Sequence, residues 1–367
     1  MKKRFLKSTL PLITVMMLVV MIVGGCASTE PVPAEPTPAE TVADPTVEEE
    51  EGLVFGNIPA ALSDEWNGYS VENFMFAAEK KGVEVQVIDP NWDDEHALNS
   101  LQDFIVKGVD AVSVFVLTPE QAQAFVDIAN EAQMPVAFEN TNLSENPHFP
   151  PITGEYVFNV HEDYRTEAYK AVSYAAQNNL GSKLFYLRGM PGMGIAEESH
   201  AGVDMAVAEY DNIELVGYRD TQWNTETGQN ALSDVIQAGI DFDVVFCNNE
   251  PIAVGALNAL RDAGLEGDIP VVASNGSPNG LRMIEEGELA ATVSVPVSLQ
   301  GLYIFKALYL YTTQGIVPPY TRIVIPSILI DQSNVHEAIS WQPSEELIDL
   351  IGGLDNWDTK GVGEYYE

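Results

Sequence analysis

A repeated order of apolar run, polar tip and amphipathic segment constrains the fold of this chain most. Its clearest instance is residues 243–280, DVVFCNNEPIAVGALNALRDAGLEGDIPVVASNGSPNG. Two apolar runs there end at polar residues, one before Asn249 and the other before Asn275, and a helical pattern lies between them. In a parallel sheet the carboxyl ends of neighbouring strands share one edge, so we expect both side chains at a ligand crevice. The alternative is that both Asn residues cap helices or form turns, as Asn often does.

The same order recurs over residues 53–330, with about four strand–helix units before residue 150 and about four after it. Val112–Leu117 is almost continuously apolar, as in a strand covered on both faces. Thr118-Pro119-Glu120 then offers a cap, a first-turn proline and an early acid for the next helix. The sequence therefore predicts an α/β protein of two Rossmann-like lobes, each a parallel sheet flanked by helices, with a cleft between them. We expect a late strand region at 323–330 and a final helix at 344–351 before an acidic tail.

The charge balance excludes one class of partner. The chain has 17 basic and 55 acidic residues and a net charge of −38. Such a chain repels phosphate backbones, so it is not expected to bind nucleic acid. The acidic surface either keeps the protein soluble or attracts cations. Of the two cysteines, Cys26 has a separate predicted fate, which leaves Cys247 without a partner and predicts no disulfide.

Residues 1–25 have the form of a secretory signal. Lys2, Lys3, Arg4 and Lys7 precede an apolar run over 10–23, which ends at Gly24-Gly25-Cys26. Small residues directly before a Cys resemble the lipobox of bacterial lipoproteins, which implies cleavage before Cys26 and attachment of lipid to its sulfur. The alternative is an uncleaved transmembrane anchor, but the run is shorter than the roughly 20 residues needed to span a bilayer. The predicted location is extracytoplasmic, on a bacterial cell membrane, through the lipid anchor alone.

Residues 26–52 are predicted to form a disordered tether. They are rich in Pro and Glu, contain no basic residue and have almost no large apolar side chain. Such a composition cannot bury enough surface to form a core. Proline stiffness and repulsion between acids keep such a segment extended.

Several motifs occur in an order typical of one family. Over about 53–330 the chain resembles type I solute-binding proteins of the ribose/galactose group, which serve bacterial ABC importers. The motifs are SDEWN (63–67), KGVDAVSV (107–114), GMPGMGIAEESHAGV (189–203), VVFCNNEPIAVGAL (244–257), VVASNGSPNG (271–280) and GELAATVSVP (287–296).

The resemblance implies two lobes joined by three crossovers. The first lobe would comprise 53–159 plus 296–324, and the second 160–295 plus 325–367. The lobes would hinge shut on a small ligand. We expect a monomer without a cofactor, whose partner in the membrane is an ABC permease. The alternative is a binding module that serves a sensor kinase or a chemoreceptor.

The resemblance also implies the binding residues. In the family, two aromatic rings enclose the sugar, and the matching positions are Trp66 and Trp223. Aromatic rings suit the apolar faces of a sugar, whereas its hydroxyls need paired donors and acceptors. The matching polar positions are Asn67, Glu139, Asn140, Glu197, Asn249 and Asn275.

The chain departs from the ribose-binding pattern at several of these positions. That pattern usually has Asp-Arg where Glu139-Asn140 stands, Arg in place of Glu197, Asp in place of Asn275, and Gln near 295. A guanidinium grips a carboxylate or adjacent hydroxyls with a forked pair of donors. Without those two forks, the pocket suits a neutral sugar or polyol, or a ligand with a cationic amine, better than an anion. Whether Arg188 or Arg219 enters the pocket from another direction remains open.

The motifs of common enzyme classes are missing from the sequence. The turn at 189–194 lacks the Gly-Lys-Ser/Thr of a phosphate-binding loop, and no HExxH or G-x-S-x-G pattern occurs. No histidine spacing indicates a metal site. Glu139 and Glu197 as a glycosidase pair remain a minor alternative. We therefore predict a binding protein and not an enzyme.

Overall fold

The computed structural model describes residues 52–139, 153–320 and 322–366. The predicted signal segment, Cys26, nearly all of the predicted tether and Asn140 lie outside the described residues. Every structural statement below concerns the compact unit that begins at Glu51.

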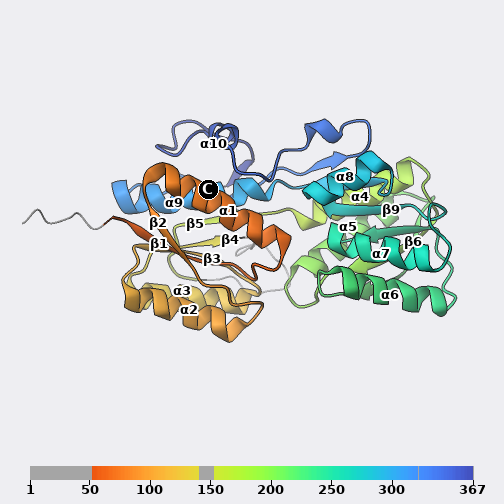
Figure 1. Cartoon of the computed structure of the whole chain (residues 1–367), viewed down its shortest axis with the longest axis horizontal. Coiled ribbons are helices and arrows are strands. Elements are labelled where there is room, and N and C mark those ends of the chain that lie inside the picture. Colours follow the sequence, from red (N-terminus) through yellow and green to blue (C-terminus); the bar gives the residue numbers. More distant parts are fainter. Residues whose placement is uncertain (1–51, 140–152, 321, 367) are drawn as a thin grey trace, which may run out of the picture. The chain divides into compact units, whose positions relative to one another are not determined.

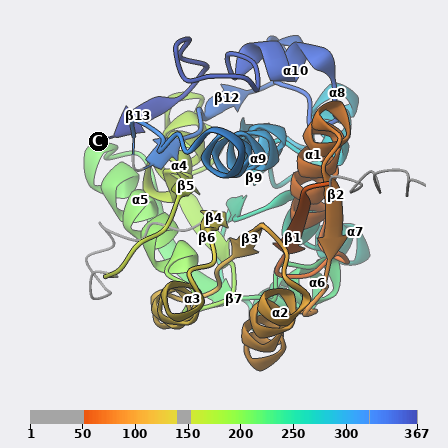
Figure 2. The same cartoon turned by 90° about the vertical axis from the view of Figure 1, so that its left-hand side faces the viewer.

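The first lobe is built on a seven-stranded sheet in the order β13-β11-β5-β4-β3-β1-β2. All its neighbouring strands pair in parallel except β13, which is antiparallel to β11. Helices α1 and α9 pack together on one face, and α2 and α3 on the other (Figure 2). The strands are β1 (Val54–Ile58), β2 (Glu84–Val87), β3 (Ala111–Phe115), β4 (Val136–Glu139), β5 (Phe158–His161), β11 (Arg322–Val324) and β13 (Glu364–Tyr366). The helices are α1 (Glu65–Lys81), α2 (Asp94–Lys107), α3 (Pro119–Ala132), α9 (Val297–Gln314) and α10 (Glu345–Leu350).

The second lobe is built on a six-stranded sheet in the order β12-β10-β9-β8-β6-β7, in which β12 is antiparallel to β10. Helices α4 and α5 pack together, and so do α6 and α7 (Figure 1). The strands are β6 (Lys183–Arg188), β7 (Glu214–Asp220), β8 (Val244–Cys247), β9 (Val271–Asn275), β10 (Ala291–Ser294) and β12 (Ile328–Ile330). The helices are α4 (Tyr164–Gln177), α5 (Ile195–Glu209), α6 (Thr225–Gln237), α7 (Glu250–Asp262), α8 (Pro278–Glu286) and the short 3-10 turn Val335–Glu337.

The continuous apolar strands are covered on both faces, as their composition predicts. In β6, Leu184 and Tyr186 belong to the cluster that α4 and α5 cover, whereas Phe185 and Leu187 belong to the cluster under α6, α7 and α8. This alternation follows from the two-residue period of a strand. It explains why β6 reads as an unbroken apolar run instead of alternating with polar residues.

Helix starts follow the signals in the sequence. Thr118 caps α3, with its Oγ1 accepting from the Gln121 N–H at 3.1 Å, and Pro119 stands in the first turn. Asp93 caps α2 in the same way. At the other end of α2, Gly108 has a φ of 72°, the left-handed conformation that glycine adopts without steric cost. No helix in the described ranges is both long and apolar enough to cross a membrane.

The end of the chain corrects the predicted lobe boundaries. The predicted strand region at 323–330 is two strands in different sheets, β11 in the first and β12 in the second. The segment after β12 returns to the first lobe, where β13 pairs with β11. Trp341, Leu347 and Ile351 join the apolar cluster around α9, and the buried Lys306 donates from Nζ to the Ile351 carbonyl at 2.9 Å. Between described strands the chain therefore passes from sheet to sheet four times, after β5, β10, β11 and β12, and not three.

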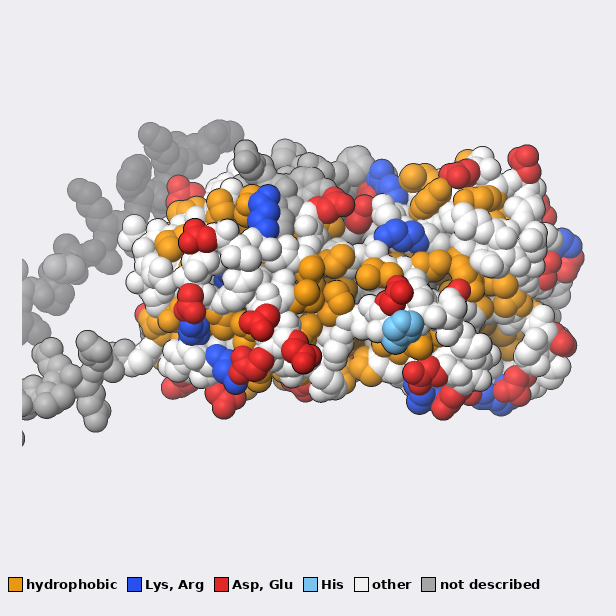
Figure 3. All heavy atoms as spheres, turned by 90° about the horizontal axis from the view of Figure 1, so that it is seen from above, with side chains coloured by type: hydrophobic (Ala, Val, Ile, Leu, Met, Phe, Trp, Pro, Cys, Tyr) orange, Lys and Arg blue, Asp and Glu red, His pale blue; other side chains and the backbone are white. Residues whose placement is uncertain are grey.

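The distribution of charged side chains on the surface favours mutual repulsion, and not cation binding, as the effect of the acidic charge. On the face drawn in Figure 3, acidic side chains are scattered, with Lys and Arg side chains among them. No group of three or more His, Cys, Asp or Glu side chains in the described residues is arranged to hold a metal ion. Dispersed charge of this kind keeps a protein soluble by mutual repulsion.

Candidate functional site

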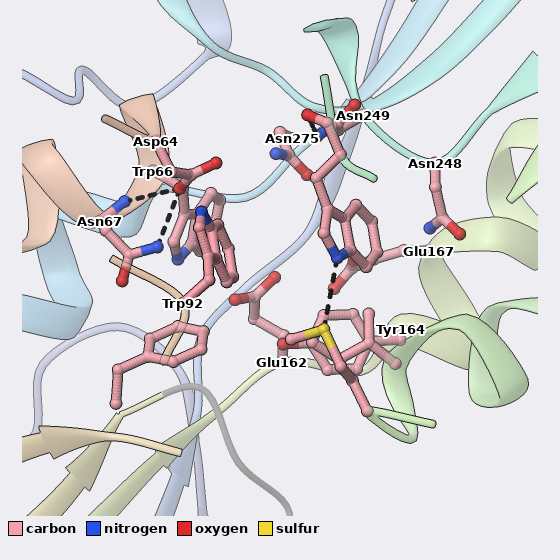
Figure 4. A pocket seen from close by; sticks show the side chains of 14 residues that line it. Asp64, Trp66, Asn67, Trp92, Glu162, Tyr164, Glu167, Asn248, Asn249 and Asn275 are labelled. Carbon is pink, nitrogen blue, oxygen red and sulfur yellow. Dashed lines mark hydrogen bonds between the residues drawn. The ribbon is translucent and has the colours of Figure 1, made fainter. Parts of the chain in front are cut away.

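A pocket lies where strand-end loops of both sheets meet (Figure 4). The space between its side chains, including the part open to solvent, is about 510 Å³. The lining residues lie at or after the carboxyl ends of β1, β2, β3 and β5 in the first lobe and of β6, β7, β8 and β9 in the second. They are Asp64, Trp66, Asn67, Trp92, Phe115, Glu162, Tyr164, Glu167, Met193, Ile195, Trp223, Asn248, Asn249 and Asn275.

The start of α1 positions the first group of polar atoms. Asp64 is the N-cap residue, and its Oδ1 accepts from both the backbone N (3.0 Å) and Nδ2 (2.9 Å) of Asn67. Asn67 in turn accepts from the Ala60 N–H at 2.9 Å. Burial raises the pKa of the Asp64 carboxyl, while the hydrogen bonds from Asn67 lower it. Asn67 lines the pocket as predicted, and it also fixes Asp64, which the sequence reading missed.

Two indoles form the wall on the first lobe. Trp66 is 8% exposed and packs edge-to-face on Trp341, with ring centroids 5.2 Å apart. Its Nε1 is buried and has no hydrogen-bond partner in the structure. Trp92 was not predicted; its backbone has a φ of 65° and its N–H donates to the Ala60 carbonyl at 2.8 Å. A tryptophan in the polar loop directly after a strand was the signal that could have identified it.

Trp223, in the loop between β7 and α6, lines the pocket from the second lobe. Its indole Nε1 donates to Met193 Sδ at 3.3 Å, and its carbonyl accepts from Asn249 Nδ2 at 3.2 Å. The ring lies so close to Gly189 that a Cβ there would come within 1.9 Å of it. The glycine turn at 189 therefore makes room for the indole, and the ring is held in one orientation.

Three asparagines follow β8 and β9. Asn249 caps α7, with Oδ1 accepting from the Ile252 N–H at 2.9 Å, so it both caps a helix and lines the pocket. Asn248, which was not predicted, accepts from the Gly189 N–H and donates to Ser199 Oγ at 3.0 Å. Asn275 has a φ of 105°, and no hydrogen bond of its side chain occurs within the described part of the chain. Its amide is the one among the three that is ready for a ligand.

A pair of buried carboxylates completes the pocket. Glu162 and Glu167, at the passage from β5 into α4, are 2% and 4% exposed, and Oε1 of each has no hydrogen-bond partner. Burial, followed by the charge of Glu167, raises the pKa of Glu162 well above its usual value. Burial and then Asp163 raise the pKa of Glu167 to about 8, with Lys170 opposing them. No signal in the sequence marks either acid, because both stand in a stretch with helical periodicity, where acids are usually exposed.

Glu139 does not line the pocket, which differs from the prediction. Its side chain is 3% exposed and accepts from Ser70 Oγ, Ser113 Oγ and Gln300 Nε2, with a longer contact of 3.5 Å from Asn57 Nδ2. These donors come from α1, β3, α9 and β1, so the carboxylate lies inside the first lobe. Both of its oxygens are already engaged within the protein.

Glu197 is also placed differently from the prediction. Its carboxylate accepts from the N–H groups of Gly192 and Gly194, each at 3.1 Å, and closes a capping box at the start of α5. It does not line the pocket. The two acids of the minor glycosidase alternative are therefore engaged in two structural roles in separate lobes.

Arg188 and Arg219 do not line the pocket either. Arg188 donates from Nε to Asp220 at 2.6 Å and lies over the Tyr218 ring, and Arg219 donates to the Tyr218 carbonyl. Among the described residues that line the pocket, none is Lys or Arg. The site is aromatic, rich in amides and acidic.

A family model described as a periplasmic binding protein domain matches residues 55–315. The chain belongs to the periplasmic binding protein family. It is 28% identical over 221 residues to the ribose import binding protein RbsB of Escherichia coli (strain K12), covering 59% of this chain and 70% of that one. It is 26% identical over 290 residues to a putative rhizopine-binding protein of Rhizobium meliloti, covering 76% and 90%.

Solved structures share the fold. The crystal structure of a galactofuranose binding protein has a TM-score of 0.69 at 21% identity and covers 78% of this chain and 96% of its own. The Caulobacter myo-inositol binding protein has a TM-score of 0.69 at 22% identity, covering 78% and 95%. The resemblance to the ribose/galactose group and the two-lobed α/β fold are confirmed. These relatives are binding proteins of transporters and not enzymes, which agrees with the prediction.

Proposed function

We propose that this protein captures a small sugar or polyol outside the cytoplasm and delivers it to an ABC importer. The observation that carries the proposal is the pair of indoles, Trp66 from the first lobe and Trp223 from the second, that line one pocket. Flat aromatic surfaces complement the apolar C–H faces of a sugar or cyclitol ring. The names of the relatives point the same way, since they mention ribose, galactofuranose and myo-inositol.

The polar rim of the pocket supplies partners for the ligand's hydroxyls. Asn275 offers a free amide, Trp66 an unpaired N–H, and Asp64 a carboxylate whose Oδ1 alone is engaged with Asn67. Each hydroxyl can donate one hydrogen bond and accept others, so a polyol satisfies a mixed set of this kind. Together with Asn249 and the stacking pair, these residues form the proposed binding set.

Closure of the lobes would complete the site. The lining residues come from both lobes, and the chain passes from sheet to sheet along short segments after β5, β10 and β11. Rotation about such segments is the hinge motion of two-lobed binding proteins. A ligand that contacts both walls favours the closed state because it binds that state more tightly.

Lipid anchoring at Cys26 is part of the proposal. Its support is the basic head, apolar run and Gly-Gly-Cys order of residues 2–26. The acidic segment 27–51 would then tether the binding unit to the membrane. We expect Cys26→Ala to move the protein from the membrane fraction to the soluble fraction of cells; a protein that stays in the membrane fraction would contradict lipid attachment at this residue.

The binding function is tested by thermal-shift screening of the purified protein against sugars, polyols, nucleosides, amines, and carboxylated or phosphorylated compounds. We expect neutral or amine-bearing polyhydroxylated compounds to raise the unfolding temperature, because ligand binding to the folded state stabilises it. Stabilisation by carboxylated or phosphorylated compounds alone would contradict the proposal, since no cationic side chain lines the pocket in the described residues.

A further inference from the structure

The carboxylates of Glu162 and Glu167 are not explained by a neutral ligand. Both belong to the passage from the first sheet into α4, and both are more than nine-tenths buried. Figure 4 shows the Glu162 carboxylate pointing into the pocket, toward the side where Trp66 and Trp92 lie. Oε1 of each glutamate is buried and has no hydrogen-bond partner among the described residues, while a hydrogen bond from the Tyr164 hydroxyl lowers the pKa of Glu162. Each acid therefore keeps one acceptor atom that the described residues do not satisfy.

In the described part of the chain no Lys or Arg forms an ion pair with either acid, although the charge of Lys170 lowers the pKa of Glu167. Lys170, one turn further along α4, donates from Nζ to the carbonyl and hydroxyl oxygens of Ser327, at 2.7 and 2.8 Å. Arg165 pairs with Glu198. Burial of a charge requires a counter-charge or several hydrogen bonds, and without them burial favours the protonated, neutral form of both acids, which is the direction of their raised pKa values. A cationic ligand would supply the counter-charge that favours the ionised pair.

We propose that the ligand is a sugar or polyol that carries a protonated primary amine, and that its ammonium group binds between Glu162 and Glu167. This inference rests on the proposed function and narrows its substrate class. A primary ammonium has three N–H donors, which match the two unpaired carboxylate oxygens and leave one more for a neighbouring acceptor. A quaternary ammonium has no N–H donors and would leave these oxygens unsatisfied.

The aromatic walls fit the same ligand. Four aromatic side chains line the same pocket as the acid pair, namely Trp66, Trp92, Tyr164 and Trp223. The faces of aromatic rings attract cations, and indole does so most strongly. The acids and the rings thus favour a positive charge together, while Asp64 and Asn275 remain for hydroxyl groups.

The test uses matched ligands, so that the wild-type protein suffices for the first measurement. Dissociation constants are measured by calorimetry for hexoses and inositols, for their mono-amino counterparts, and for the N-acetylated amines. We expect an amino compound to bind at least tenfold more tightly than the hydroxyl compound with the same skeleton. Acetylation should remove this preference, because it removes the charge and two of the three donors.

The second measurement assigns the preference to the two acids. Glu162→Gln, Glu167→Gln and the double variant keep the side-chain shape and remove the charge. We expect each single variant to lower the amine preference several-fold and the double variant to abolish it, with neutral compounds little affected. Asp163→Asn is the matched control: it removes one charge from the same segment, retains the cap of α4 through its oxygen, and does not line the pocket. It should keep most of the preference.

The outcomes separate the two proposals. If neutral sugars or polyols bind and their amino counterparts bind no more tightly, the amine inference is wrong while the proposed function stands. An amine preference that persists in the double glutamine variant would also overturn the assignment to this pair. If neither series binds, the proposed function itself fails. Because the wild-type comparison needs no substitution, a variant that folds poorly does not affect the first conclusion.

Discussion

Glu139 and the pair Glu162/Glu167 are both buried acidic sites, but their surroundings differ. Glu139 accepts from side chains on four separate elements of the first lobe, and both of its oxygens are engaged. Glu162 and Glu167 each keep an oxygen without a hydrogen-bond partner at the wall of the pocket. Burial alone therefore does not identify a ligand-binding acid. The useful criterion is whether the protein itself satisfies the carboxylate.

The largest loss of stability is expected from replacing Glu139, because we assign this acid a structural role. Glu139→Ala removes the common acceptor of Ser70, Ser113 and Gln300 and leaves these buried donors without it. Each unsatisfied buried donor costs on the order of 1–3 kcal/mol, so we expect the free energy of unfolding to fall by about 4 kcal/mol. Urea denaturation measures this loss.

Glu139→Gln is the milder variant at the same position. Its amide keeps one acceptor oxygen, so the loss of stability should be smaller and ligand affinity should change less than twofold. A Gln variant of normal stability that no longer binds ligand would show that Glu139 contacts the ligand after all, as the sequence resemblance implied.

The next effect concerns the ionisation of Glu167. Its pKa is about 8 in the folded protein against the usual 4.5. Between these values the folded state holds a proton that the unfolded state has lost, so this group makes stability fall as pH rises from about 4.5 to 8. In this window the free energy of unfolding of wild type should fall, relative to that of Glu167→Gln, by about 1.4 kcal/mol for each unit by which the pH rises.

The comparison reports on the Glu162/Glu167 pair, because Glu167→Gln also removes the charge that raises the pKa of Glu162. Glu162 and Asp163 disfavour the ionised form of Glu167 and Lys170 favours it. Glu250, whose pKa burial raises to about 7, and His161, whose pKa burial lowers to about 3, also titrate but cancel in the difference. A difference that does not vary between pH 5 and pH 8 would mean that Glu167 ionises normally and is satisfied within the protein.

The local sequence did not distinguish Glu139, which the protein satisfies internally, from Glu162 and Glu167 at the pocket. Glu139 stands at a strand end, which favours a site residue, but its donors Ser70, Ser113 and Gln300 are far away in the chain. Glu162 and Glu167 stand in a region with helical periodicity, where acids are usually exposed. Their burial results from the packing of two lobes around a crossover. Neither environment follows from local pattern.

The features that could be predicted depend on short-range order. Trp66, Asn67, Trp223, Asn249 and Asn275 lie at or after the carboxyl ends of strands, and a parallel sheet brings such segments to one edge. The tail could not be predicted in this way. Strand β13 has three residues and exists through its pairing with β11, about forty residues earlier in the chain. Similarly, Trp341 becomes buried because it packs against Trp66 and Tyr69 in the first lobe.

A smaller effect, on ligand affinity, is expected from removing one of the two indoles that we propose to stack on the ligand. Trp223→Ala removes the indole from the second lobe and should weaken binding by roughly tenfold or more, or about 1.4 kcal/mol. Calorimetry with the compound that binds wild type most tightly measures the change. Trp357→Phe is a suitable control, because Trp357 packs on Phe158 away from the lining residues. Equal affinity of Trp223→Ala and wild type would remove this indole from the site.

The smallest effect concerns Asn275, whose free amide is the neutral counterpart of the unpaired carboxylates. Glycine is the right replacement, because the φ of 105° would strain any residue with a Cβ and glycine adopts it without strain. Asn275→Gly deletes the side chain and should weaken binding of a hydroxylated ligand by roughly fivefold, since one hydrogen bond contributes about 1 kcal/mol. Asn91→Gly is the matched control, at a φ of 53° outside the pocket lining, and should leave affinity unchanged. If the two glycine variants bind alike, an unpaired side chain in the pocket is no guide to ligand contact, and the contrast between Glu139 and the Glu162/Glu167 pair loses its functional meaning.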